Sequence, residues 1–218
     1  NGNSGLALVQ LSDKALDKQL KILDTIKEKL DFVKDGATSA SGIEVIRTDI
    51  NTLLTQLDSI ASDTNYNSSY TLQKSNSDTD YSLSLGILLD PNSSNSVLTP
   101  SIKSNTEGLS LDTLKNLGAG GLSESVAEQQ SLIVDTASST IKSYSESFDL
   151  TQSEIEISVE NLTNIEKTTS KSKDEILSVN KGKENAILDK YRLLEKASEF
   201  AIVQANITQA TGLRLLTD

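Results

Sequence analysis

Apolar residues recur at every seventh position near both ends of this 218-residue chain, and the pattern is absent from its middle. The N-terminal series is Val9, Leu16, Leu23 and Leu30. The C-terminal series are Ile141, Phe148, Ile155 and Leu162, followed by Ile187, Leu194, Ala201, Thr208 and Leu215. This period places one narrow apolar seam along a long helix, and another helix has to cover that seam. The pattern therefore predicts long helices from both ends of the chain that pack side by side.

Two helices are predicted before residue 66. The first runs from about Leu6 to Lys34, because Gly36 can take the left-handed conformation that ends a helix. The second runs from about Ile43 to Ser62 and starts behind Ser41 and Glu44, which have the spacing of a capping box. The short link between them makes the two helices neighbours.

Helical spacing returns after residue 123. A helix of about 44 residues is predicted from Glu124 to Lys167, and a last helix runs from about Glu175 to Leu216. The Thr-, Ser- and Lys-rich tract 167–174 between them is a candidate hinge.

The middle of the chain, 67–122, contains both prolines and has a different texture. Apolar residues alternate with smaller or polar ones over Tyr81, Leu83, Leu85, Ile87 and Leu89, which predicts a strand. Val97–Lys103 is a weaker candidate for the strand that returns as a hairpin. The expected fold is mainly α: an elongated antiparallel helical bundle or coiled coil of N- and C-terminal segments with a small inserted β-hairpin. The expected divisions are 1–66, 67–122, 123–174 and 175–218.

Composition excludes several function classes. The chain has 20 basic and 31 acidic residues, and a net charge of -11 argues against nucleic acid or an anionic membrane as the main partner. No apolar run approaches the ~20 residues of a membrane-spanning helix. Cys and His are absent, and there is no phosphate-binding loop, so we expect no catalytic site, metal site or cofactor, and no enzyme. Met is absent too, and we expect an N-terminal segment before Asn1.

The last helix carries a candidate packing seam. Its members recur at steps of three and four residues: Tyr191, Leu194, Ala197, Ala201 and Ala205. Identical copies are the expected partner, because a repeated contact that does not close into a ring builds a helical filament. The alternative is that these residues close a bundle within one chain.

Several stretches resemble bacterial flagellin, in particular the flagellins of spiral, polar-flagellated bacteria. Ala15-Leu-Asp-Lys-Gln-Leu-Lys-Ile-Leu-Asp-Thr-Ile-Lys-Glu-Lys is similar to the first core helix, and Arg47-Thr-Asp-Ile-Asn-Thr-Leu-Leu continues the likeness. Gln204-Ala-Asn206 and Leu213-Arg-Leu-Leu216 are similar to the flagellin C-terminus. The likeness covers about 1–68 and 123–218. It departs at 174–180, where the Arg of the usual flagellin motif is missing, and in its short middle. The resemblance implies a short flagellin whose N-terminal inner-tube helix would precede Asn1.

The resemblance implies a structural subunit of the flagellar filament that self-assembles for motility. Its expected partners are identical subunits, a flagellar export chaperone, and the filament cap and junction proteins; its expected location is secreted, in the extracellular flagellum. The alternatives are a hook–filament junction protein, and a secreted coiled-coil adhesin or effector that presents its hairpin to a host.

Two sets of surface residues follow from the resemblance. At positions where receptor-activating flagellins carry Arg, Leu and Glu, this chain has Thr25, Lys29 and Asp49, which predicts weak activation of the innate flagellin receptor. Serines expected on the outer face are candidates for O-glycosylation: Ser68, Ser69, Ser93, Ser94 and Ser96. Ordinary solvated helix positions and plain loop chemistry are the respective alternatives.

Overall fold

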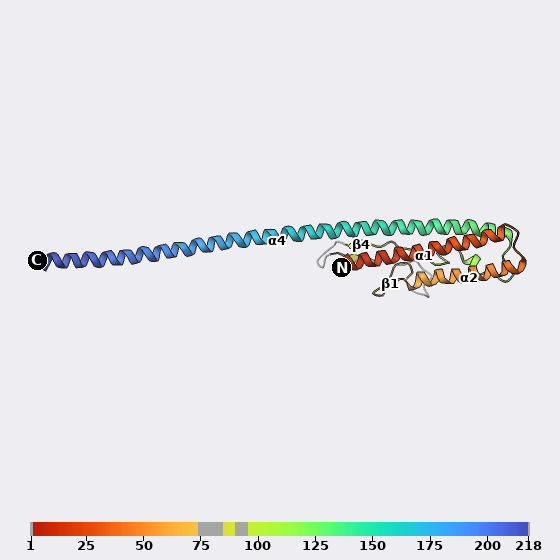
Figure 1. Cartoon of the computed structure of the whole chain (residues 1–218), viewed down its shortest axis with the longest axis horizontal. Helices are drawn as coiled ribbons and strands as arrows, with labels where there is room; N and C mark the ends of the chain where they lie inside the picture. The colour runs from red at the N-terminus through yellow and green to blue at the C-terminus, as the bar shows by residue number, and fades with distance from the viewer. Residues whose placement is uncertain (1, 74–84, 90–95, 218) are drawn as a thin grey trace. The chain divides into compact units, whose positions relative to one another are not determined.

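The computed structural model describes residues 2–73, 85–89 and 96–217, with side chains up to Ala210. It divides into two units, Asn1–Asn161 and Leu162–Asp218. Its elements are mainly helical, as predicted (Figure 1). They are α1 (Gly2–Lys34), α2 (Ala40–Asp63), β1 (Asn65–Tyr66), β2 (Ser69–Tyr70), β3 (Gly86–Leu88), β4 (Ser96–Leu98), α3 (Asp112–Lys115) and α4 (Glu124–Thr217).

In the first unit, α1 lies beside both α2 and the part of α4 before residue 162 (Figure 1). The side chains of Asp13 and Lys27 on α1 contact Ser145 and Asp135 on α4, respectively. Residue numbers therefore rise along one helix as they fall along the other, so the two run antiparallel. This confirms the predicted pairing of segments from the two ends of the chain.

The heptad positions form the core of this unit. Val9, Leu16, Leu23 and Leu30 on α1 are all buried. Their counterparts on α4, at Ile141, Phe148 and Ile155, are buried as well, and Val134 extends the series by one heptad. Leu162, the last member of the predicted series, is half-buried at the start of the second unit.

Two predictions concern the turn between α1 and α2. The structure confirms the one for the end of α1 and contradicts the one for the start of α2. Gly36 has a φ of 67°, the left-handed conformation that favours glycine. Helix α2, however, begins at Ala40, and its N-cap is Ser39, not Ser41, so the capping-box prediction is wrong. Ser39 is extended, and its Oγ accepts a hydrogen bond from the amide of Gly42 at 3.2 Å.

Two small antiparallel hairpins follow α2. The turn of β1–β2 holds Asn67 and Ser68, both with positive φ, as a type I′ turn requires. The predicted hairpin from the middle of the chain is β3–β4, with Ile87 opposite Val97. Tyr81 and Leu83 lie outside the described residues.

The second strand of this hairpin is shorter than predicted: β4 ends at Leu98, and the rest of Val97–Lys103 is not strand. Thr99 still exchanges hydrogen bonds with Leu85, but Pro100 has no N–H to donate. The buried face of β3 packs on α1, where Gly5 leaves room for Ile87 because a Cβ there would collide with the Ile87 side chain.

The loop after β4 is fixed to α1 and α2 through polar side chains. Buried Gln19 donates to the carbonyl oxygens of Leu57 (3.0 Å) and Ser104 (2.9 Å). Asp58 accepts hydrogen bonds from the Thr106 amide (2.7 Å) and hydroxyl (3.0 Å), and it pairs with Lys115 of α3. The 99–122 loop therefore closes one side of the first unit.

The predicted hinge at 167–174 is wrong, because α4 is helical through that tract. The tract contains neither Pro nor Gly, the residues that commonly break a helix. At its start, the Thr168 hydroxyl is satisfied within the helix by the Asn164 carbonyl oxygen at 2.8 Å. Helical segments were correctly predicted on both sides of the tract.

Candidate assembly surface

The second unit is a helix without a covering partner among the described residues. Every residue in 163–210 is exposed. The predicted seam lies within it: Tyr191 is 64% exposed and Leu194 52%, and Ala197, Ala201 and Ala205 are exposed as well. Because helical neighbours are three and four residues apart, these five side chains follow one side of the helix.

A second apolar row on the same helix was missed in the sequence. Leu193, Phe200 and Ile207 recur at every seventh position, and they are 73%, 75% and 54% exposed. At 3.6 residues per turn this row lies about 100° from Leu194 and Ala201. The signal was present as a second heptad one residue out of phase with the first. This helix therefore presents apolar side chains on more than one side.

This exposure bears on the alternative that the seam closes a bundle within one chain. The heptad residues of the first unit, such as Phe148 and Ile155, are fully buried. Over 163–210, within the part of the chain that the structure describes, the corresponding positions Ile187, Leu194 and Ala201 are all exposed. Large apolar side chains exposed along one helix are typical of an interaction site.

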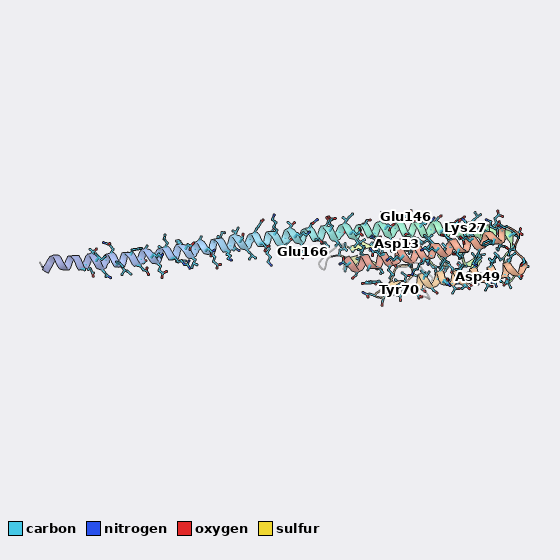
Figure 2. All side chains as sticks on the ribbon, viewed as in Figure 1. Asp13, Lys27, Asp49, Tyr70, Glu146 and Glu166 are labelled. Atoms are coloured by element: carbon cyan, nitrogen blue, oxygen red, sulfur yellow. The ribbon has the colours of Figure 1, made fainter. Side chains whose placement is uncertain are left out.

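The predicted receptor positions lie on α1 and α2, and the structure brings two of them together. Lys29 Nζ lies 2.7 Å from Asp49 Oδ2, an ion pair between the helices. The Thr25 hydroxyl donates to the Lys21 carbonyl oxygen at 2.8 Å, one turn earlier on α1. Asp49 is labelled in Figure 2. At these positions the surface of α1 and α2 therefore carries the Lys29–Asp49 ion pair, and the Thr25 hydroxyl is already bonded within α1.

Other ion pairs hold this unit together. Lys27, labelled in Figure 2, hydrogen-bonds to Asp135 across the α1–α4 contact, and this bond raises the pKa of Lys27. Arg47 donates to Glu44 and to the Leu117 carbonyl oxygen. The bonds from Arg47 and from the Gly120 amide lower the pKa of the Glu44 carboxyl. These contacts attach the 117–120 turn to α2.

The candidate glycosylation serines lie on both hairpins. Ser68 is exposed at the tip of the β1–β2 turn, Ser69 is half-buried, and Ser96 is exposed at the start of β4. Ser93 and Ser94 lie outside the described residues.

No helix among the described residues has the length and apolar character required to cross a membrane. No group of three or more acidic, His or Cys side chains in the same part of the chain could hold a metal ion.

Known proteins match both the sequence and the fold. Residues 1–77 match the family model of the bacterial flagellin N-terminal helical region. Flagellin A of Helicobacter mustelae is 43% identical over 67 residues, 31% of this chain and 14% of that relative. Flagellin B of Helicobacter pylori is 40% identical over 84 residues, 38% of this chain and 16% of that relative. The chain therefore spans only about a seventh of the length of these relatives.

A crystal structure of Bacillus cereus flagellin matches with a TM-score of 0.60 at 21% identity, over 74% of this chain and 87% of that chain. At this identity the likeness concerns the fold alone. The sequence matches cover the N-terminal helices, and the structural match extends well beyond them. Residues 1–77 are therefore similar to the flagellin N-terminal helical region, and the chain shares the fold of the Bacillus cereus flagellin structure.

Proposed function

We propose that this chain is a structural subunit of the bacterial flagellar filament and that it polymerises with identical copies into a helical tube. The observation that carries the proposal is the uncovered helix at 163–210, with apolar rows on more than one side. Burying one Leu- or Phe-sized side chain contributes about 1.5–3 kcal/mol. Several such contacts repeated between identical copies, without closing into a ring, build a filament.

The remaining partners and the location belong to the same proposal. An aggregation-prone apolar helix needs protection before assembly, which an export chaperone would supply, and the filament ends need cap and junction proteins. The subunit would act outside the cell, in the flagellum, and its role would be structural and not enzymatic. The family relationship of residues 1–77 supports this assignment.

Electron microscopy of the purified full-length protein under polymerising salt tests the function. We expect filaments of uniform diameter. Dispersed monomers throughout would contradict the proposal. A protein found only at filament ends would indicate a hook–filament junction protein, and a monomer that binds host cells would indicate an adhesin or effector.

The receptor positions give a prediction for host recognition. We expect weak activation of the vertebrate innate flagellin receptor, because Lys29 places a hydrated charge, engaged with Asp49, where an apolar contact is needed, and Thr25 cannot supply the planar donors of Arg. A receptor reporter assay with the monomer measures this. The variant Thr25→Arg/Lys29→Leu should gain at least about tenfold in potency, if it recovers one buried apolar or bidentate contact. Full potency of the parent chain would contradict the prediction.

Glycosylation of the exposed hairpin serines is a further proposal. Ser68 and Ser96 are accessible, whereas half-buried Ser69 offers less room for a sugar. We expect the protein from its native source to exceed its sequence mass by whole sugar units, and Ser68→Ala/Ser96→Ala to remove part of that excess. Intact-mass spectrometry checks this, and a mass equal to that of the bare chain would refute it.

A further inference from the structure

Charged side chains are unevenly distributed along α4. Residues 124–161 carry eight acidic side chains and one basic one, whereas 167–196 carry eight basic and five acidic ones. The two segments belong to different units. The net charge of the first segment is negative and that of the second is positive, so each suits a partner of opposite charge.

In the first unit, the acidic side chains of α4 gather on one side of the helix. We call the following residues the acidic row: Glu128, Asp135, Glu146, Asp149, Glu156 and Glu160. At 100° per residue, all six lie within an arc of about 80°, which also contains Lys142. Asp135 pairs with Lys27, and Glu156 accepts a hydrogen bond from Gln152 at 2.9 Å. Among the described residues the other four form no ion pair, and all four are exposed.

In the second unit, basic side chains gather in the same way. We call the following residues the basic row: Lys167, Lys171, Lys181, Arg192 and Lys196. They too lie within an arc of about 80°, which also contains Asp174 and Asp189, and they are all exposed. Arg192 has a distant contact with Asp189 at 3.9 Å, and the four lysines have no ion-pair partner in the described part of the chain. The row lies on the side of the helix about opposite the seam of Leu194 and Ala201.

The two rows match in length as well as in sign. At 1.5 Å per residue, the acidic row extends over about 48 Å and the basic row over about 44 Å. Identical copies with a net charge of -11 repel one another unless their surfaces place opposite charges together. A basic row on one copy provides such a surface for the acidic row of another.

We propose that, in the assembled protein, the basic row of one copy lies against the acidic row of a neighbouring copy. The inference rests on the proposed polymerisation and adds to it the surface that selects the neighbour. The apolar seam and the basic row are on different sides of one helix, so a copy can make both contacts at once. The charged contact fixes the placement of the neighbour, and burial of the seam supplies most of the affinity.

Charge reversal of two lysines tests this contact. In Lys171→Glu/Lys181→Glu, we expect the monomer concentration left after polymerisation to rise roughly tenfold over the parent at about 0.1 M salt, and clearly less at about 1 M salt, where charges are screened beyond ~3 Å. Sedimentation of full-length polymers measures the concentration. The rescue variant adds Glu146→Lys/Glu156→Lys, two positions that are ten residues apart, as Lys171 and Lys181 are. It should return the concentration to within about threefold of the parent.

The control is Lys14→Glu/Lys18→Glu, which changes the net charge equally at two exposed positions of α1, away from the helix that carries the seam and the basic row. It should polymerise much better than the row variant. An equal effect of both lysine pairs, or no rescue by the added lysines, would overturn the inference while the parent still forms filaments. A parent that never polymerises would overturn the proposed function and this inference with it. Circular dichroism verifies that each variant keeps its helix content.

Discussion

Replacing Leu194 by Asp is expected to prevent polymerisation while leaving the monomer folded. Leu194 is a member of the seam and is 52% exposed, so the substitution opens no cavity in the buried core of the described part of the chain. In the filament it would remove about 1.5–3 kcal/mol of apolar burial and place an unpaired carboxylate in the contact. Each 1.4 kcal/mol is a factor of ten in affinity, so the critical concentration should rise by at least about a hundredfold.

The control for this experiment keeps the apolar character of the position. Leu194→Met conserves volume and hydrophobicity, and it should polymerise within a few-fold of the parent. Sedimentation and electron microscopy give the critical concentration, and circular dichroism gives the helix content. Normal filaments from the Asp variant would show that the seam is not a contact between copies.

Truncating Phe148 to Ala is expected to lower the free energy of unfolding of the first unit by about 3–5 kcal/mol. Phe148 is fully buried on α4, in the heptad series that packs between the two ends of the chain. Its removal leaves a cavity in that core, and rigid packing around it allows only partial collapse. The change is a large share of the ~5–15 kcal/mol that typically stabilises a domain.

Phe32 provides the matched control, because it is also a helical phenylalanine in the same unit but is 62% exposed. Phe32→Ala should change the free energy of unfolding by less than about 0.5 kcal/mol. Urea unfolding of the monomer, followed by circular dichroism, compares both variants with the parent. The dependence of the unfolding free energy on urea concentration should be equal in all three. Equal effects of the two substitutions would mean that the α1–α4 seam is not the core of this unit.

The heptad spacing was sufficient to predict the helices and the pairing of the two ends. Leu16 and Phe148 are far apart in sequence, but each belongs to a series that requires a partner helix, and both are buried. The hairpin could be predicted because the apolar alternation around Ile87 has the period of a strand. Its second strand ends at Leu98, earlier than predicted, because Pro100 has no N–H to donate to the ladder.

Other features of the structure were not predicted from the sequence, for different reasons. Ser39 and Ser41 both have a hydroxyl suited to capping, and backbone geometry selected Ser39. The link from Gln19 to the loop carbonyl of Ser104 bridges residues 85 positions apart, and neither residue alone signals it. Polar composition at 167–174 suggested a hinge, but Ser and Thr hydroxyls can bond within a helix, as Thr168 does. The row of Leu193, Phe200 and Ile207 had a readable period that the stronger seam obscured.

We expect identical copies to cover the exposed helix at 163–210. Cryo-electron microscopy of the native assembly, at a resolution that separates helices, would show whether they do. We predict that this helix lies nearest the filament axis, in contact with the same helix of neighbouring copies through Leu194 and Ala201, with the β3–β4 hairpin outermost. A map in which residues 163–210 face solvent, or in which copies join without this helix, would contradict the account.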